Sequence, residues 1–296
     1  MLNPNIAYLL GMIAGKGEIH RGNKETKIII RIPHKNLEIE GENTQQSVKA
    51  SLADIVGRLN TLVGTNINLD ATKENVAYII FSKSNEDYLI RTINAYFENK
   101  TSWRDFRIPK EIFSASKDIK IEFLRGIADV TGHIRRSNIA YGIEYNHRVY
   151  IEIMSNWDIC IDIANLLKDL DVPVQNIRWA HPNIVDPQLE YYNKGIKNYK
   201  EHQIKIWAEE FEKIGFNIEH KNKLLKIFAD LNRENWKKYQ KKPISETHHK
   251  YYWETREIEK KKPIHPDENN PSIHPNIRGR HFDSWKQIAR ELGYHE

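Results

Sequence analysis

The sequence predicts an α+β fold made of two pseudo-symmetric αββαββα repeats, followed by a small basic C-terminal module. Three observations lead to this prediction. A short glycine-ended segment occurs twice, at a constant offset of 115 residues. The same order of helical and strand-like patterns follows each copy. Basic and aromatic residues then gather after position 232. We therefore divide the chain into residues 1–100, 101–232 and 233–296, the first two being the repeats.

The repeated segments are LLGMIAGKGEI at 9–19 and LRGIADVTGHI at 124–134. At the offset of 115, four residues of the first copy match the second: Leu9, Gly11, Gly17 and Ile19 match Leu124, Gly126, Gly132 and Ile134. Because a repeated sequence unit indicates a repeated structural unit, we expect the two copies to fold alike.

In the first copy, an apolar helix over 6–14 is expected to end at Gly17. The segment KIIIRI at 27–32 is rich in β-branched residues and stops at Pro33, which predicts a strand. Helical periodicity follows over 45–62. Two strands at 66–69 and 76–81 and a helix at 87–97 complete the copy.

The second copy begins with a predicted helix over 120–128. Strands are predicted next at 133–139 and 148–154, then a helix at 157–170, a strand at 175–179, and helices at 202–215 and 221–231. This order suits a sheet whose one face is covered by helices. The other face is then free for a ligand, and we expect the two sheets together to form a twisted saddle.

The bulk composition predicts a chain with a packed core that resides inside the cell. Of its 296 residues 40% are hydrophobic, and Cys160 is the single cysteine, which excludes an intramolecular disulfide. The apolar N-terminal stretch lacks a basic leader and is interrupted by Lys16 and Glu18, so we expect neither a signal peptide nor a membrane span. We expect a cytoplasmic, nucleoid-associated monomer. The net charge of +5 points only weakly to a polyanionic partner.

The two glycine-ended segments resemble the signature of the LAGLIDADG homing endonuclease family. The sequence RIPKEIFSASKDIKIEFLRG, which leads into the second segment, is similar to the corresponding lead-in of two-copy, single-chain members. The resemblance spans roughly residues 5–230 and is strong around 5–20 and 107–135. It implies that the motif helices pack side by side between two halves of a DNA-cradling sheet. The small residues of the helices, Gly11, Ala14, Gly15, Gly126 and Ala128, suit such a close approach.

The positions that hold the catalytic acids in active family members are occupied by Lys16 and Thr131. In the family, an acid at each position binds a divalent metal at the scissile phosphate. An ammonium repels Mg²⁺ and a threonine supplies one neutral oxygen, so we expect the usual catalysis to be crippled. Lys16 is then either a phosphate contact or a favourable charge at a helix C-terminus.

Two nearby acids keep an enzymatic function open. Asp129 lies three positions before Gly132, and Glu18 directly follows Gly17. Either acid is a candidate for a displaced Mg²⁺ site, or a group that satisfies a helix end or pairs with an arginine. We assign no metal site and no cofactor, unless the protein is an active Mg²⁺-dependent endonuclease.

Alternate residues of the strands are the candidates for DNA contacts. Together with Lys16, these candidates are Lys27, Arg31, Arg135, Asn176 and Arg178. Arg136 and Arg148 are weaker candidates, because each lies on the opposite face of its strand or in a register that the sequence does not fix. Arginine can bind guanine through two hydrogen bonds, whereas lysine mostly contacts phosphate.

The last 64 residues have a character of their own. Residues 233–296 contain 14 Lys and Arg against 10 Asp and Glu, and six of the 13 histidines. The ending, GRHFDSWKQIARELGY at 279–294, weakly resembles small DNA-binding repeats attached to homing endonucleases. Histidines at 248, 249, 265, 274 and 281 lack ordered ligand spacing and cysteine partners, which favours solvated loop residues over a zinc or nuclease site.

The leading hypothesis is a sequence-specific, duplex DNA-binding protein with a degraded nuclease centre. An active homing or restriction-type endonuclease that uses displaced acids is the first alternative. An RNA-splicing maturase, which would bind structured RNA, and a transcription regulator are further alternatives.

Overall fold

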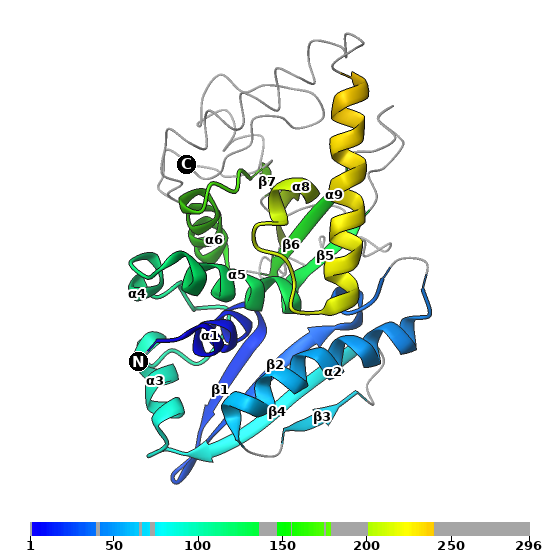
Figure 1. Ribbon diagram of the computed structural model, residues 1–296. Helices are drawn as coiled ribbons and strands as arrows, with labels where there is room; N and C mark the ends of the chain where they lie inside the picture. Colours follow the sequence, from blue (N-terminus) through cyan, green and yellow to red (C-terminus); the bar gives the residue numbers. More distant parts are fainter. Residues whose placement is uncertain are drawn as a thin grey trace, which may run out of the picture.

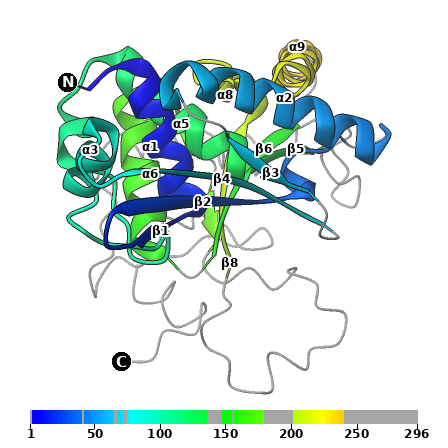
Figure 2. The ribbon, with the colours of Figure 1, turned by 90° about the horizontal axis from the view of Figure 1, so that it is seen from below.

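The computed structural model describes residues 2–39, 42–64, 67–71, 75–135, 147–154, 156–174, 176–178 and 201–239. Within these residues the chain forms two four-stranded antiparallel sheets. The helices lie together on one side of the sheets, which Figure 1 and the view from below in Figure 2 both show. In neither view does a labelled α-helix lie across the opposite faces of the sheets.

The first repeat has the predicted αββαββα order, although its first strand, at 17–21, was not among the segments predicted from the sequence. It consists of α1 (Pro4–Lys16), β1 (Gly17–Arg21), β2 (Glu25–Pro33), the short 3-10 helix η1 (His34–Asn36), α2 (Thr44–Val63), β3 (Asn68–Asp70), β4 (Val76–Ser84) and α3 (Tyr88–Tyr96). The strands are arranged in the order β1-β2-β4-β3. The Asn3 side chain accepts a hydrogen bond from the Ile6 backbone N–H and begins α1, and Pro4 at its first position suits a helix start.

The second repeat follows a connection that contains α4 (Lys110–Phe113). It consists of α5 (Lys117–Thr131), β5 (Gly132–Arg135), β6 (Arg148–Met154), α6 (Trp157–Asp169), β7 (Asn176–Arg178), β8 (Glu201–Trp207), α8 (Ala208–Phe211) and α9 (Glu219–Tyr239). Its strand order, β5-β6-β8-β7, reproduces that of the first repeat. The predicted pair of pseudo-symmetric α+β repeats is therefore confirmed.

The predicted helix over 202–215 is wrong, because residues 201–207 form strand β8. Ile204 and Ile206 are buried in the core and alternate with Gln203 and Lys205, so the period is that of a strand. β8 pairs antiparallel with both β6 and β7. Only the end of the predicted helix remains, as α8. The last helix, α9, runs through position 232, where we placed a boundary, and the division into three segments stays a prediction.

The centre of the molecule is the crossing of α1 and α5, which lie side by side in Figures 1 and 2. A Cβ atom on Gly11 would overlap the carbonyl oxygen of Phe123, and one on Gly126 would overlap that of Tyr8. These contacts are reciprocal, because Tyr8 and Phe123 occupy the same place in the two repeats. The predicted contact of the motif helices at Gly11 and Gly126 is confirmed, and it needs residues without a side chain.

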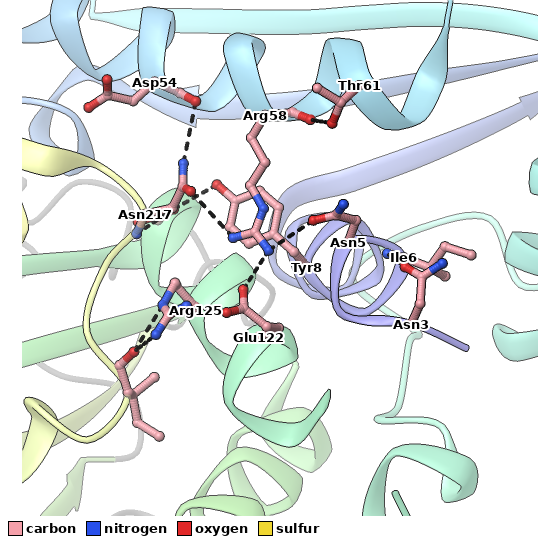
Figure 3. Close-up of polar contacts among 12 residues, drawn as sticks. Asn3, Asn5, Ile6, Tyr8, Asp54, Arg58, Thr61, Glu122, Arg125 and Asn217 are labelled. Atoms are coloured by element: carbon pink, nitrogen blue, oxygen red, sulfur yellow. Dashed lines mark hydrogen bonds and ion pairs between the residues drawn. The ribbon is translucent and has the colours of Figure 1, made fainter. Parts of the chain in front are cut away.

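A half-buried arginine joins α2 to this pair of helices (Figure 3). The Arg58 guanidinium lies 4.0 Å from the centroid of the Tyr8 ring and 2.6 Å from Glu122 on α5. It also donates to the side-chain oxygen of Asn217 at 3.3 Å. Arg125 pairs with the same Glu122 and donates to the Ile214 carbonyl at 2.7 Å. The two repeats and the segment before α9 are thus held together by charge-assisted hydrogen bonds.

The connection between the repeats is fastened to the second one. Arg107 donates two hydrogen bonds to Asp162 on α6, at 2.6 and 2.7 Å, and the Ile108 N–H donates to the same carboxylate at 3.1 Å. Asn156 donates to the carbonyls of Trp103 and Phe106. The lead-in sequence around Arg107 therefore has a structural role, which is to fix the path of the connection. Within the described residues, no helix is long and apolar enough to cross a membrane.

Candidate nucleic-acid interface

The outer face of the first sheet carries exposed cations. On β2, Lys27 and Arg31 are exposed, while Ile28, Ile30 and Ile32 between and beyond them are buried against the helices. Lys27 lies opposite Ser82 and Arg31 opposite Tyr78 on β4, so small and aromatic side chains border the two cations. This face provides two accessible positive charges on a surface that no described helix covers.

The second sheet carries the other predicted residues. Arg135 at the end of β5 is exposed and lies opposite Arg148, whose guanidinium is 4.5 Å from the centroid of the Trp207 ring. In the register of β7 and β8, Asn176 lies opposite Lys205 and Arg178 opposite Gln203. The side chains of 176 and 178 lie outside the described residues, as do residue 136 and the whole segment 240–296 with its histidines.

Lys16 is the last residue of α1, and it is 7% exposed. Its ammonium lies 5.3 Å from the centroid of the Trp103 ring, within the range of a cation–π interaction. As a cation at a helix C-terminus, it also complements the negative end of the helix dipole. The positive charge is therefore stabilised at the end of the motif helix.

Thr131, the equivalent residue of α5, is fully buried. Its hydroxyl donates a hydrogen bond to the Ile127 carbonyl one turn earlier, at 2.7 Å. An ammonium and a buried hydroxyl supply no anionic oxygen, so these two residues do not fit a divalent metal. Over the described part of the chain, no group of three or more His, Cys, Asp or Glu side chains is placed to hold a metal ion.

Asp129 lies among the helices rather than on the outer face of a sheet. Its Oδ2 accepts hydrogen bonds from the Tyr8 hydroxyl at 2.6 Å and from the Asn217 N–H at 3.3 Å. Burial raises the pKa of this carboxyl to about 6, although the positive charge of Lys221 and the two hydrogen bonds oppose the shift. Asp129 therefore acts as an acceptor between α1, α5 and the segment before α9.

Glu18 lies on the outer face of β1, with its side chain 40% exposed. Its carboxylate is 3.3 Å from His20 Nε2 and 3.7 Å from the Arg104 guanidinium. Glu18 and Asp129 share no partner in these contacts. The structure thus places the two acids in different surroundings, one accessible at the end of a motif helix and one enclosed among the helices.

Sequence reasoning missed Trp103 and Arg104, which belong to the connection between the repeats. The Trp103 N–H donates to the Gly17 carbonyl at 3.0 Å, and the Ile19 N–H donates to Thr101 at 2.8 Å, so the connection runs along β1. The Arg104 guanidinium stacks on the Trp103 ring at 4.5 Å. Stacking holds a guanidinium in place and leaves its N–H groups available for a ligand. No periodic pattern in the sequence brings residue 104 to the end of α1.

Sequence reasoning also missed the buried cation behind the end of α5. The Lys221 ammonium, in the first turn of α9, donates to the carbonyls of Asn36 and Gly132, both at 2.9 Å. Burial lowers the pKa of Lys221 to about 8. The same ammonium lies 4.3 Å from the centroid of the Phe216 ring. Lys221 therefore ties the end of the second motif helix to the first repeat.

No family model matches the sequence. A protein of Methanocaldococcus jannaschii described as a probable translation initiation factor IF-2 is 20% identical over 186 residues, which make up 62% of this chain. The chain spans only 15% of the length of that protein.

Similar solved structures include LAGLIDADG proteins. The meganuclease I-AabMI, bound to uncleaved DNA, is 12% identical with a TM-score of 0.38, covering 86% of this chain and 98% of its own. The homing endonuclease I-SmaMI, bound to cleaved DNA, is 9% identical with a TM-score of 0.41, covering 86% and 96%. A variant of I-DmoI in complex with its target DNA is 16% identical with a TM-score of 0.35, covering 74% and 95%.

Because these identities and TM-scores are low, the fold class rests on the strand order of this chain and on its reciprocal glycine contact.

Proposed function

We propose that this protein binds duplex DNA across the outer faces of its two sheets, and that it lacks the carboxylate-held metal centre of LAGLIDADG nucleases. The observation that carries the proposal is the pair of residues at the ends of the motif helices, a stabilised lysine and a buried threonine. The exposed cations Lys27, Arg31 and Arg135 on the outer faces support it, as do the DNA complexes of the similar LAGLIDADG structures.

The chemistry of the two positions separates binding from cleavage. Phosphodiester hydrolysis assisted by Mg²⁺ needs oxygen ligands that hold the metal against both the attacking and the leaving oxygen. Loss of several kcal/mol of this stabilisation slows the reaction on the order of a thousandfold or more. Binding has no such requirement, because the ammonium of Lys16 and the guanidinium of Arg104 are permanent charges that attract phosphate without a metal.

We expect the affinity of the wild-type protein for mixed-sequence duplex DNA to be the same in Mg²⁺ and in chelator. In the double variant Lys16→Asp, Thr131→Asp, two carboxylates at the ends of the motif helices would repel nearby phosphates, so binding should require Mg²⁺. Some Mg²⁺-dependent cleavage of the bound duplex should also return. Gel-shift titrations and plasmid nicking, each with chelator and with Mg²⁺, measure both effects. Lys27→Ala is the control, which should weaken binding without creating a demand for metal.

Robust Mg²⁺-dependent cleavage by the wild-type protein would contradict this proposal. If Glu18→Gln or Asp129→Asn then abolished the cleavage, the active-endonuclease alternative with a displaced site would replace it. If a small amount of structured intron RNA displaced duplex DNA from the protein in a competition assay, the result would instead favour the maturase alternative. Selection of bound molecules from a randomised duplex pool would define the target sequence, and sedimentation of the complex would test the expected monomer.

A further inference from the structure

The outer face of the second sheet carries a buried polar cluster directly beyond the end of α5. His133 follows Gly132 and occupies the place that Glu18 has in the first repeat. Its ring stacks on Tyr150, with centroids 5.2 Å apart and planes 4° from parallel. The side chain is 5% exposed, and neither ring nitrogen has a hydrogen-bond partner. A buried imidazole without a hydrogen-bond partner is unusual and needs an explanation.

The neighbour of His133 is an ion pair that joins the two repeats. Glu152 Oε2 on β6 lies 2.6 Å from the Lys35 ammonium on η1, and 3.6 Å from His133 Nδ1. The other carboxylate oxygen accepts a hydrogen bond from Gln203 on β8 at 3.1 Å. Lys35 itself is 42% exposed, so its ammonium reaches both the cluster and the solvent. The one carboxylate is thus shared between a lysine and a histidine from different repeats.

The charges around His133 are unbalanced. Arg135 on its own strand, Lys35 on η1 and Lys221 on α9 all oppose its protonation, and Glu152 on β6 alone favours it. Lys205 on β8 lies over the Tyr150 ring, 5.5 Å from its centroid. Burial, with these cations, lowers the pKa of His133 to about 3. The imidazole is therefore neutral in the free protein, and Glu152 is the one anionic group among those that shift its pKa.

We propose that His133, Glu152, Lys35 and Arg135 form a proton-linked subsite for one backbone phosphate of bound DNA. This inference rests on the proposed function, and it adds that one phosphate binds at this cluster and that binding takes up a proton. A phosphodiester that contacts Lys35 and Arg135 adds a second negative charge near the ring. Lys35 then turns from Glu152 to the phosphate, and the released carboxylate accepts the N–H of His133. Both negative groups favour the protonated ring, so that binding takes up one proton from water.

The test is the pH dependence of affinity for mixed-sequence duplex DNA at constant salt. If the complex holds one more proton than the free protein, the association constant rises by up to about tenfold per pH unit as the pH falls from 7 to 5. His133→Phe keeps the aromatic stack on Tyr150 but cannot titrate. We expect this variant to lose that part of the pH dependence, whatever other histidines contribute. Equal slopes for the two proteins would overturn the inference.

Glu152→Gln tests the competition for Lys35. Without the carboxylate, Lys35 loses its ion pair with Glu152 and turns to phosphate more easily, so this variant should bind DNA more tightly at pH 7 and depend less on pH. Lys27→Ala is the matched control outside the cluster, and it should weaken binding without changing the slope. Weaker binding by Glu152→Gln would contradict the proposed competition.

A second measurement needs no variant. Calorimetric titration of the wild-type protein with DNA, in two buffers of different ionisation enthalpy, counts the protons taken up on binding. An uptake near zero at pH 6 would overturn the inference even if His133→Phe failed to fold. A wild-type protein that binds no duplex at any pH would instead refute the proposed function, so the two failures are distinguishable.

Discussion

At the scale of single residues, the junction behind the motif helices holds two ionisable groups that burial shifts in opposite directions. The pKa of Asp129 is raised to about 6 and that of Lys221 is lowered to about 8. Both changes reflect the cost of placing a charge away from water. Hydrogen bonds from Tyr8 and Asn217 only partly offset this cost for Asp129. The ionised carboxylate therefore reduces the stability of the folded chain.

Asp129→Asn should stabilise the protein at pH 7 by about 1–3 kcal/mol. Below pH about 4 the wild-type carboxyl is protonated in both states and has no pH-dependent effect. Between about pH 4 and 6 the unfolded chain loses this proton while the folded chain keeps it, so stability falls as the pH rises. The asparagine variant should lack this fall.

Urea unfolding at pH 4, 5, 6 and 7 measures the difference between the two proteins. Asp105→Asn, at an exposed position, is the control and should leave the pH dependence of stability unchanged. An asparagine variant less stable than the wild type at pH 7 would mean that the carboxylate's attraction to Lys221 outweighs its burial.

At the scale of elements, the crossing of α1 and α5 sets the geometry of both sheets. β1 follows α1 and β5 follows α5 without a loop, so the distance between the helices fixes how far apart the sheets begin. The helices approach until the backbone of each fills the space above a glycine of the other. A single added methyl group at either glycine must separate the helices and, with them, the two outer faces.

Gly11→Ala and Gly126→Ala should each destabilise the fold by about 1–3 kcal/mol through overpacking. Gly57→Ala is the matched control in the middle of α2, where an added Cβ meets nothing within 4 Å. This change should stabilise the protein by about 0.5–1 kcal/mol, because alanine is the better helix former. Thermal unfolding of the three variants measures the contrast. Equal stability for all three would contradict the reciprocal contact.

Local sequence patterns predict most of the elements, because the spacing of apolar residues within a segment differs between a helix and a strand. The helix predicted at 45–62 and the strand predicted at 148–154 differ little from α2 and β6. The sequence did not predict β8. The alternation of polar residues with Ile204 and Ile206 covers only a short segment, and no turn residue marks where the strand begins. Its place follows from the repeat, since β4 has the same position in the first sheet.

The candidate site was less predictable than the fold. Lys16, Thr131, Lys27 and Arg31 could be found because they belong to a motif or to a regular strand. Arg104, Lys35 and Glu152 act through contacts between segments that are distant in sequence, and such contacts depend on strand register and on the path of a connection. No pattern within one segment carries that information.

At the scale of the whole molecule, α9 links the two repeats. The Glu219 N–H donates to Asp54 on α2 at 2.8 Å, and His220 lies 2.8 Å from the Ser51 hydroxyl. Near the other end of the helix, Asn232 accepts from the His147 N–H at 2.8 Å, and it donates back to the His147 carbonyl. A truncation within α9 would therefore damage the core itself.

Removal of residues 240–296, after the end of α9, should leave the unfolding temperature of the core nearly unchanged. We expect it to weaken DNA binding and to flatten its salt dependence, because each lost phosphate contact lowers the slope of log K against log salt by about 0.9. Titrations over a range of salt concentrations measure the slope. An unchanged slope would mean that this segment makes no phosphate contact.

The crossing of the motif helices has a consequence for how such a chain can be divided or duplicated. Gly15 and Val130 occupy the same place in the two repeats, and a Cβ on Gly15 would lie 2.9 Å from Val130 Cγ2. The absent side chain of one repeat makes room for the branched side chain of the other. A homodimer of the first repeat would leave a hole there, and a homodimer of the second would bring two valines into collision. Separately produced halves should therefore choose each other over themselves, so that this one position favours a mixed pair.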